Sequence, residues 1–253
     1  MRIDLNCDLG ESFGNYTIGQ DEDVLQLVSS ANIACGYHAG DHNVMKKTVR
    51  LAAEAGVGLG AHPGLPDLGG FGRRYIEVQP EDVYNMVVYQ IGALEAFVRI
   101  EGERLQHVKP HGALFNMASK DRAIADAIAR AVKDVDESLI LFGLAGSELV
   151  MAGREHGLTV AREVFADRSY QPDGTLTPRT EPGAVIEDED EVTERVLRMI
   201  REGVVTASDG SEVALEPDTI CVHGDGPKAL AFVSNLRKCL QEAGVQVRKV
   251  GER

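Results

Sequence analysis

The sequence has few basic residues for its length and no long apolar run. Among its 253 residues, 26 lysines and arginines stand against 40 aspartates and glutamates, so the formal net charge is -14 at pH 7. Nucleic acids and anionic membrane surfaces attract concentrated positive charge, so neither is expected as a partner. No apolar run approaches the about 18 residues of a membrane-spanning helix, and no signal-peptide pattern opens the chain. We therefore expect a cytoplasmic protein that binds neither nucleic acid nor membrane.

Several common motifs are also absent. The four cysteines form no CxxC pair, which disfavours a structural zinc knuckle, and we expect them to be reduced and mostly buried. Neither a Walker A motif nor a G-x-S-x-G elbow occurs. The glycines of residues 58–64 lack the spacing of a dinucleotide fingerprint, and Pro63 interrupts the helix start that such a site requires. Acid–base or metal chemistry is therefore favoured over a serine nucleophile.

Short apolar runs alternate with amphipathic helical segments along the chain. The predicted strands are Ile3–Cys7, Ala31–Cys35, Val57–Ala61, Gln106–Lys109, Leu139–Leu144, Thr159–Glu163 and Thr219–Val222, with a possible eighth at Val245–Val250. Short connections between alternating strands and helices are typical of parallel sheets. The run VVTASDGSEVAL at 204–215 is typical of a small β-hairpin insertion. The sequence thus predicts one α/β domain over residues 1–253, a closed or nearly closed (β/α) barrel.

Polar side chains follow nearly every predicted strand. They are Asp8, His38, His62, His111, Glu163 and His223. The carboxyl ends of barrel strands converge at one mouth, whereas an open sheet gathers only those at its switch point. This distribution favours a barrel with its site at that mouth.

One strand end carries a lysine and a histidine two residues apart. Lys109 is costly inside a fold unless it is paired or functional, and His111 brings a second polar group to the same place. The neighbouring His107 is interpreted as a surface residue. Arg168 has two open interpretations, a structural pair with Asp167 or a clamp for a substrate carboxylate.

Two further segments have competing interpretations. His38 and His42 are four residues apart and would share a helix face, as metal-binding pairs do, but Asp41 is also a good helix N-cap that would leave His38 outside the helix. Asp8 and Glu11 follow the first strand three residues apart, where they would bind a metal, act as acid and base, or add only surface polarity. The glycine-rich segment 224–226 would be an anion cradle or a plain turn.

Six segments between residues 4 and 225 resemble signature blocks of the LamB/YcsF family. They are DLNCDLGE, ANIACGYHAGD, GAHPG, VKPHGAL, EVFADRSYQPDGTL and CVHGD. The resemblance implies an irregular seven-stranded (β/α) barrel of the glycoside hydrolase/deacetylase kind. It also implies the A subunit of an ATP-dependent 5-oxoprolinase, which opens the lactam of 5-oxo-L-proline to L-glutamate as ATP with Mg²⁺ is cleaved to ADP and phosphate. The implied partners are subunits B and C.

With this reaction in view, the residues at the strand ends receive hypothetical roles. Lys109 would neutralise phosphate or oxyanion charge, and His111 or His223 would move protons. Glu163 or Asp8 would orient or activate water. The expected substrate-binding residues are Asn6, His38, His62, Arg168 and Asp225.

A bound metal is a separate question. The deacetylases to which this fold is related hold a divalent ion through one aspartate and two histidines, which makes Asp8, His38 and His42 candidate ligands, and a metal-free site is equally open. The alternative enzyme is a stand-alone metal-dependent deacetylase or amidohydrolase. A non-catalytic scaffold subunit is the third interpretation. The sequence does not say which subunit would bind ATP.

Overall fold

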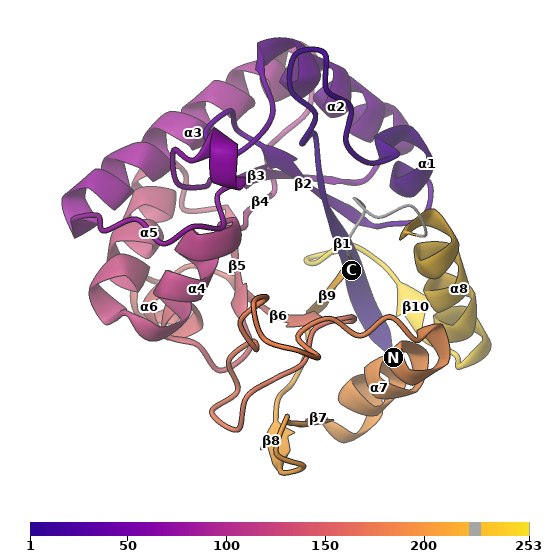
Figure 1. Ribbon diagram of the computed structural model, residues 1–253. Helices are drawn as coiled ribbons and strands as arrows, with labels where there is room; N and C mark the ends of the chain where they lie inside the picture. The colour runs from indigo at the N-terminus through magenta and orange to yellow at the C-terminus, as the bar shows by residue number, and fades with distance from the viewer. Residues whose placement is uncertain (223–228, 253) are drawn as a thin grey trace.

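Seven parallel strands close into a barrel in the computed structural model, which describes residues 1–222 and 229–252 (Figure 1). In the order in which they pair, the strands are β1 (Arg2–Leu9), β2 (Ser30–Ala34), β3 (Gly58–His62), β4 (His107–Val108), β5 (Ile140–Leu144), β6 (Val160–Phe165) and β9 (Thr219–Val222). The barrel closes because β1 pairs with two strands, so that Cys7 lies opposite Ala31 of β2 and Val222 of β9. The predicted fold class is confirmed, and each predicted strand lies within two residues of the observed one.

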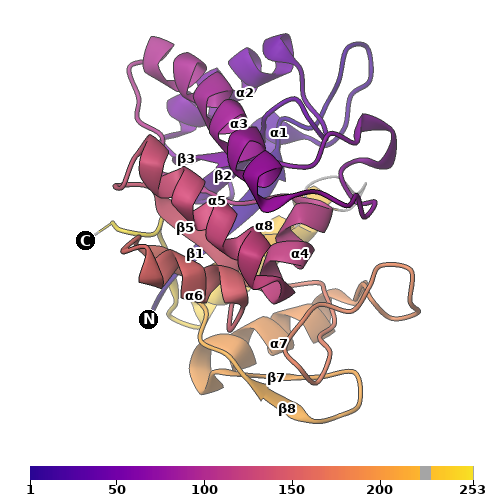
Figure 2. The ribbon, with the colours of Figure 1, turned by 90° about the vertical axis from the view of Figure 1, so that its left-hand side faces the viewer.

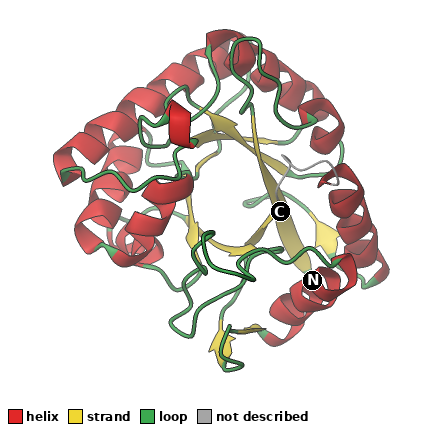
Figure 3. Ribbon diagram, in the orientation of Figure 1, coloured by secondary structure: helices red, strands yellow, loops and turns green. Residues whose placement is uncertain are grey.

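Helices surround the barrel (Figure 3). They are α1 (Asp21–Leu25), α2 (His42–Ala55), the 3-10 helix η1 (Leu68–Gly70), α3 (Pro80–Ile100), α4 (Gly112–Lys120), α5 (Arg122–Val135), α6 (Glu148–Glu155), α7 (Glu189–Glu202) and α8 (Ala229–Glu242). Within the described residues, none of them has the length and apolarity needed to cross a bilayer.

Local signals in the sequence set the helix ends. The side chain of Asp41 accepts hydrogen bonds from the backbone N–H groups of Asn43 and Val44 and so caps α2. Gly56 ends the same helix with φ of 69°, a left-handed conformation that favours glycine. α3 begins at Pro80, which needs no donor there, and packs its apolar face against the barrel and α5.

Two small additions flank the barrel. β7 (Val204–Thr206) and β8 (Glu212–Ala214) form the predicted antiparallel hairpin, which projects from the rest of the molecule below α7 (Figure 2). β10 (Gln246–Val247) lies beside the first residues of β1. The predicted eighth strand, Val245–Val250, is therefore reduced to two residues outside the barrel.

The inside of the barrel carries a group of polar side chains beside a small apolar cluster that includes Phe142, whereas its outer side is apolar. Successive side chains of a strand point to opposite faces, and on β1 this places Asp4, Asn6 and Asp8 together. Their side chains bond to residues of β2, β6 and β9 and to Lys109, which follows β4. The intervening Leu5 and Cys7 join the apolar core between strands and helices. The lumen is thus a hydrogen-bonded network that leads up to the mouth of the barrel.

His107 belongs to this network, so its predicted surface position is wrong. Its side chain is fully buried in the lumen, where the ring stacks on Phe142 with centroids 4.2 Å apart and Nε2 contacts Asn32 Oδ1 at 2.7 Å. Gly60 of β3 makes room for the ring, because a Cβ there would lie 2.0 Å from His107 Nε2. The position of this histidine depends on the space that the neighbouring strand β3 leaves. The pattern of residues along β4 does not indicate that space.

Candidate active site

A cavity of about 720 Å³ opens at the carboxyl ends of the strands. Its polar floor includes Asp8, His62, Lys109 and His111. Its outer wall is formed by α4 and by residues 175–180 of the long loop after β6, with Arg73, Arg168 and Arg179 contributing positive charge. This is the volume of a cleft that holds a small-molecule ligand, and it lies where (β/α) barrels carry their sites.

Lys109 is the central charge of the site. It follows β4, and its side chain is only 2% exposed. Nζ lies 2.9 Å from Asp8 Oδ1 and 2.8 Å from Glu163 Oε1, and it also contacts Asn6 Oδ1 at 3.2 Å. Burial alone would lower the pKa of Lys109, but the negative charge of Asp8 and Glu163 outweighs it and holds the pKa well above its ordinary value. Lys109 is therefore a fixed ammonium ion at the cavity floor.

Asp8 joins the ammonium to the histidines. Its Oδ1 accepts hydrogen bonds from Lys109 and from Asn32 Nδ2, the latter at 2.8 Å, and its Oδ2 lies 3.2 Å from His62 Nε2. Burial opposes ionisation, but the positive charges of His62 and Lys109 hold the pKa of Asp8 well below its usual range. Because its side chain remains 16% exposed, this carboxylate is accessible from the cavity.

Glu163 lies deeper than Asp8. It is fully buried, and Oε1 accepts hydrogen bonds from Lys109 and from Asn6 Nδ2, whereas Oε2 has no hydrogen-bond partner within the described part of the chain. Burial raises the pKa of Glu163 despite the nearby ammonium. Glu163 is therefore suited to position Lys109 rather than to contact a ligand, because it does not line the cavity.

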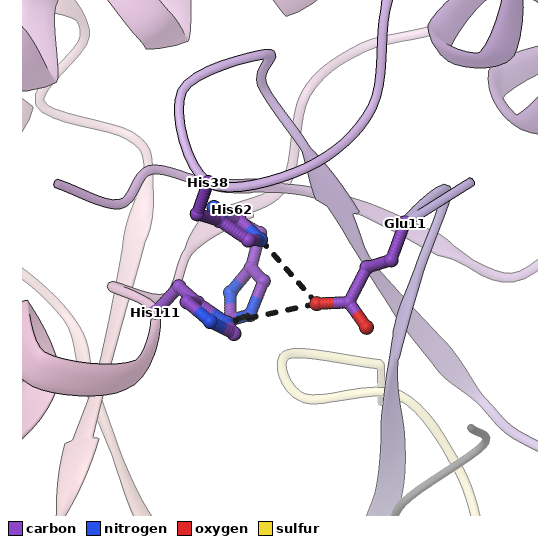
Figure 4. Close-up of side chains that lie close together, drawn as sticks. All are labelled: Glu11, His38, His62 and His111. Atoms are coloured by element: carbon purple, nitrogen blue, oxygen red, sulfur yellow. Dashed lines mark hydrogen bonds and ion pairs between the residues drawn. The ribbon is translucent and has the colours of Figure 1, made fainter. Parts of the chain in front are cut away.

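Three histidines and one glutamate lie together beside Asp8 (Figure 4). We refer to Glu11, His38, His62 and His111 as the Glu–His cluster. Each of these side chains is buried, and one ligand atom from each lies within 4.8 Å of those of the others. Glu11 Oε1 is 3.3 Å from His38 Nε2 and 3.6 Å from His111 Nδ1. Burial holds the pKa of both His38 and His111 well below the usual value, so these two rings are neutral at pH 7.

A buried arginine fixes the loop after β6. Arg168 is buried, and its guanidinium donates hydrogen bonds to the backbone carbonyls of Ala184, at 3.0 Å from Nε, and of Thr177. Burial lowers the pKa of Arg168 to about 10, which leaves it charged at neutral pH. Of its two predicted roles, the geometry favours a structural one, with loop carbonyls as hydrogen-bond acceptors.

The predicted site residues are not all brought together. The cluster and the lysine network contain Asn6, Asp8, His38, His62, Lys109, His111 and Glu163. His42 is not among them, and this corrects the predicted ligand set: it is exposed at the first residue of α2, because Asp41 caps the helix just before it. His223 and Asp225 lie outside the described residues.

The sequence indicated Glu11 only as one half of an acidic pair with Asp8, not as an expected site residue, and it gave no indication of Arg73. Glu11 stands three residues after Asp8, and this acidic pair was the available signal. For Arg73, no pattern along the chain was informative, since the residue reaches the cavity from the irregular segment after η1.

Comparison with known proteins gives consistent matches over the whole length. The family model described as the LamB/YcsF family matches residues 3–253. The A subunit of the 5-oxoprolinase from Halalkalibacterium halodurans is 63% identical over 252 residues, which is 100% of this chain and 98% of that protein. Its counterpart from Bacillus subtilis is 60% identical with the same coverage.

Solved structures agree with the described fold. The crystal structure of a lactam utilization protein from Thermus thermophilus superimposes with a TM-score of 0.92 at 50% identity, covering 98% of this chain and 99% of that one. A polysaccharide deacetylase from Bacillus cereus has a TM-score of 0.50 at 12% identity, with coverage of 99% and 92%. At that identity the second likeness concerns the fold alone, which is the deacetylase-like barrel that was expected.

Proposed function

The chain belongs to the LamB/YcsF family, and from this premise we propose that it is the A subunit of an ATP-dependent 5-oxoprolinase. The reaction is the opening of the lactam ring of 5-oxo-L-proline to L-glutamate, coupled to cleavage of ATP to ADP and phosphate. The relatives that carry this subunit name are 54–63% identical over nearly the whole chain. Subunits B and C are the proposed partners, and ATP with Mg²⁺ is the proposed co-substrate.

The observation that carries the proposal is the fixed ammonium of Lys109 beside the partly exposed carboxylate of Asp8 at the cavity floor. A lactam carbonyl is a poor electrophile, so its opening needs activation of the oxygen and delivery of water to the carbon. Phosphorylation of the lactam oxygen by ATP would release ADP and provide a leaving group. An ammonium held in a water-poor site stabilises the negative charge that then develops on the oxygen.

Asp8 is the proposed base for the attacking water. Its Oδ1 is occupied by Lys109 and Asn32, which leaves Oδ2, beside His62, to accept a proton. Attack of this water on the activated carbon and cleavage of the ring C–N bond, with a proton taken up by the nitrogen, give the γ-phosphate ester of glutamate. A second water then hydrolyses this acyl phosphate to L-glutamate and phosphate. Asp8, which holds the proton taken from the first water, is the proposed proton donor to the ring nitrogen.

Charge around the cavity supports an anionic substrate. Arg73 and Arg179 line the wall opposite the floor, and we propose that they hold the substrate carboxylate and the phosphoryl group. Arg168 donates from its guanidinium to loop carbonyls, and we propose that it shapes the wall without binding the carboxylate.

The test measures glutamate and ADP formed from 5-oxo-L-proline and Mg-ATP by this chain alone and with purified B and C subunits. We expect both products in equal amounts in the complete mixture. Asp8→Asn should lower kcat by about 10²–10⁴-fold, the usual contribution of a general base. The matched control is His42→Gln, which changes an exposed histidine outside the cavity and should leave kcat unchanged.

Two results would contradict the proposal. Absence of glutamate from every mixture of folded subunits would remove the activity itself. Release of acetate from N-acetylated sugars by the chain alone, without ATP, would favour the alternative of a stand-alone deacetylase.

A further inference from the structure

We propose that the Glu–His cluster binds one divalent transition-metal ion, separate from the Mg²⁺ that accompanies ATP. The proposal concerns a binding site of the chain itself and does not depend on the proposed 5-oxoprolinase activity. It rests on the spacing of the ligand atoms, on the hydrogen bonds at the far side of two imidazole rings, and on the glycines that leave room for the rings.

The ligand atoms are spaced as the corners of a metal-coordination polyhedron. Metal–ligand bonds of about 2.0–2.1 Å in a tetrahedral site place neighbouring ligand atoms about 3.3–3.4 Å apart. In the cluster, Glu11 Oε1 lies 3.3 Å from His38 Nε2 and 3.6 Å from His111 Nδ1, and His111 Nδ1 lies 2.9 Å from His62 Nε2. Along these three edges, shifts of at most about 0.5 Å would give the spacing of a bound ion, and the remaining separations, which reach up to 4.8 Å, would close further around it.

Two of the rings have their tautomers fixed by backbone carbonyls. His62 Nδ1 lies 2.7 Å from the carbonyl oxygen of Lys109, and His111 Nε2 lies 2.8 Å from that of Phe71. A carbonyl only accepts, so each of these nitrogens carries hydrogen and donates it. His62 Nε2 and His111 Nδ1 are therefore the nitrogens that remain to bind a proton or a metal ion.

These two nitrogens face each other across 2.9 Å, and His62 Nε2 also lies 3.2 Å from Asp8 Oδ2, so a positive species is favoured between or beside them. A proton shared by the two rings satisfies one lone pair of each. A metal ion satisfies the same two and also uses the nitrogen of His38 and the carboxylate of Glu11, both of which point to the same place (Figure 4). Imidazole ligands of metal ions commonly donate their other N–H to a carbonyl or carboxylate, as His62 and His111 do here.

Glycines in the surrounding backbone leave space for the imidazole rings, and a side chain at these glycines would clash with the rings. His38 stacks on His111 with centroids 3.7 Å apart and planes 4° from parallel. A Cβ at Gly64 would lie 2.6 Å from His38 Nδ1, and one at Gly72 would lie 2.6 Å from His38 Cβ. The rings are therefore held in position before an ion arrives, which lowers the cost of binding.

The ligand set indicates the class of ion. Three imidazoles and one carboxylate suit zinc, cobalt, nickel, iron or manganese, whereas magnesium and calcium prefer oxygen ligands throughout. Since His62 and His111 also line the cavity, the ion would border the cavity next to Asp8 and would not be sealed in the core. The site is thus accessible to exchange with ions in solution.

The experiment uses the full chain without a histidine tag, stripped with EDTA, incubated with Zn²⁺ and then desalted. Elemental analysis should find about one zinc per chain, and titration with Co²⁺ should give the visible absorption of a low-symmetry site. Glu11→Gln and His111→Gln should each weaken zinc binding by at least about 10-fold, because each removes a direct ligand. His42→Gln is the matched control and should retain wild-type affinity, because this histidine is exposed outside the cluster.

Zinc-edge X-ray absorption on the loaded wild-type chain counts imidazole ligands without any substitution, so a variant that fails to fold does not obscure the result. Three imidazoles per zinc support the proposal. Absence of retained metal, or equal affinity in wild type and both ligand variants, would overturn it and leave the shared proton as the occupant of the gap. Because neither ATP nor lactam is present, these outcomes are independent of whether the assembled enzyme makes glutamate.

Discussion

Replacement of the buried lysine tests the electrostatic core of the site. Lys109→Met keeps an unbranched side chain, one heavy atom shorter, but removes the ammonium that lies within 3 Å of both Asp8 and Glu163. Removing one partner of a buried ion pair costs about 3–5 kcal/mol, because the other charge stays buried without compensation. A domain of ordinary stability has about 5–15 kcal/mol in total, so the variant should fold but unfold at a much lower urea concentration.

The loss should depend on pH in a defined direction. Without the ammonium, the folded pKa of Glu163, which burial already raises, rises further, and the depressed folded pKa of Asp8 rises as well, since burial is then opposed by less positive charge. A carboxyl with a raised folded pKa contributes stability below its unfolded pKa, and that contribution is lost as pH rises through the folded pKa. The penalty of Lys109→Met should therefore be largest at neutral pH and shrink towards pH about 4.

The assay is urea unfolding followed by far-UV circular dichroism or tyrosine fluorescence, since the chain has six tyrosines and no tryptophan. Lys46→Met, on the exposed side of α2, is the control and should change stability by less than about 0.5 kcal/mol. The double variant Lys109→Met with Glu163→Gln should recover part of the loss, because one buried carboxylate is then a neutral amide. A cost below about 1 kcal/mol for Lys109→Met, or no pH dependence, would refute the assignment of a buried, carboxylate-paired ammonium.

Three further predictions concern the barrel and its cysteines. Gly60→Ala should lower the free energy of unfolding by about 1–3 kcal/mol, because the new Cβ forces His107 to move. Gly92→Ala, in an exposed and open part of α3, should instead raise it by about 0.5–1 kcal/mol. Thermal unfolding compares the two variants, and equal effects would contradict the packing argument. Burial raises the pKa of Asp4 in the folded protein, so the unfolded chain loses this proton at lower pH. Wild-type stability should therefore fall as pH rises from the unfolded to the folded pKa of Asp4. Asp4→Asn should lack that part of the pH dependence in urea titrations from pH about 3 to 7. Cys239 is the only cysteine of the four that is not fully buried, so Ellman's reagent should modify one thiol in the native protein and four in denaturant, and rapid reaction of a second native thiol would show that the burial is wrong.

The fold was predictable because local patterns along the chain carry most of it. Continuous apolar runs marked the buried strands, and Asp41 and Pro80 marked helix starts. The position of the site followed from one geometric rule, that polar residues after parallel strands meet at the mouth of a barrel. Asp8, Lys109 and Glu163, which are far apart in sequence, lie within ion-pair distance for this reason.

The incorrect predictions concern residues whose position depends on contacts between elements that are separate in the sequence. His107 was interpreted as a surface residue because β4 is too short for periodicity to show which face is buried, and the vacant space beside it comes from Gly60 on β3. Glycines two residues apart in a strand were the available signal, since they mark a face where a neighbour's side chain approaches closely. His42 was linked to His38 by helical spacing, but the cap at Asp41 separates the two.

The polar lumen explains why so many charged groups are kept at the mouth of the barrel. A (β/α) barrel usually fills its interior with branched apolar side chains, which stabilise the fold without specifying any protonation state. Here Asn6 and Asn32 connect the buried Lys109 to Asp8 and His107, so each polar group restricts the orientation of the next. Such a network is costly if a member is left unpaired, and it fixes its members in one arrangement when all are satisfied. The site holds an ammonium and a carboxylate largely out of water, next to several imidazoles. For such a site, a fixed arrangement of polar groups matters more than an apolar barrel interior.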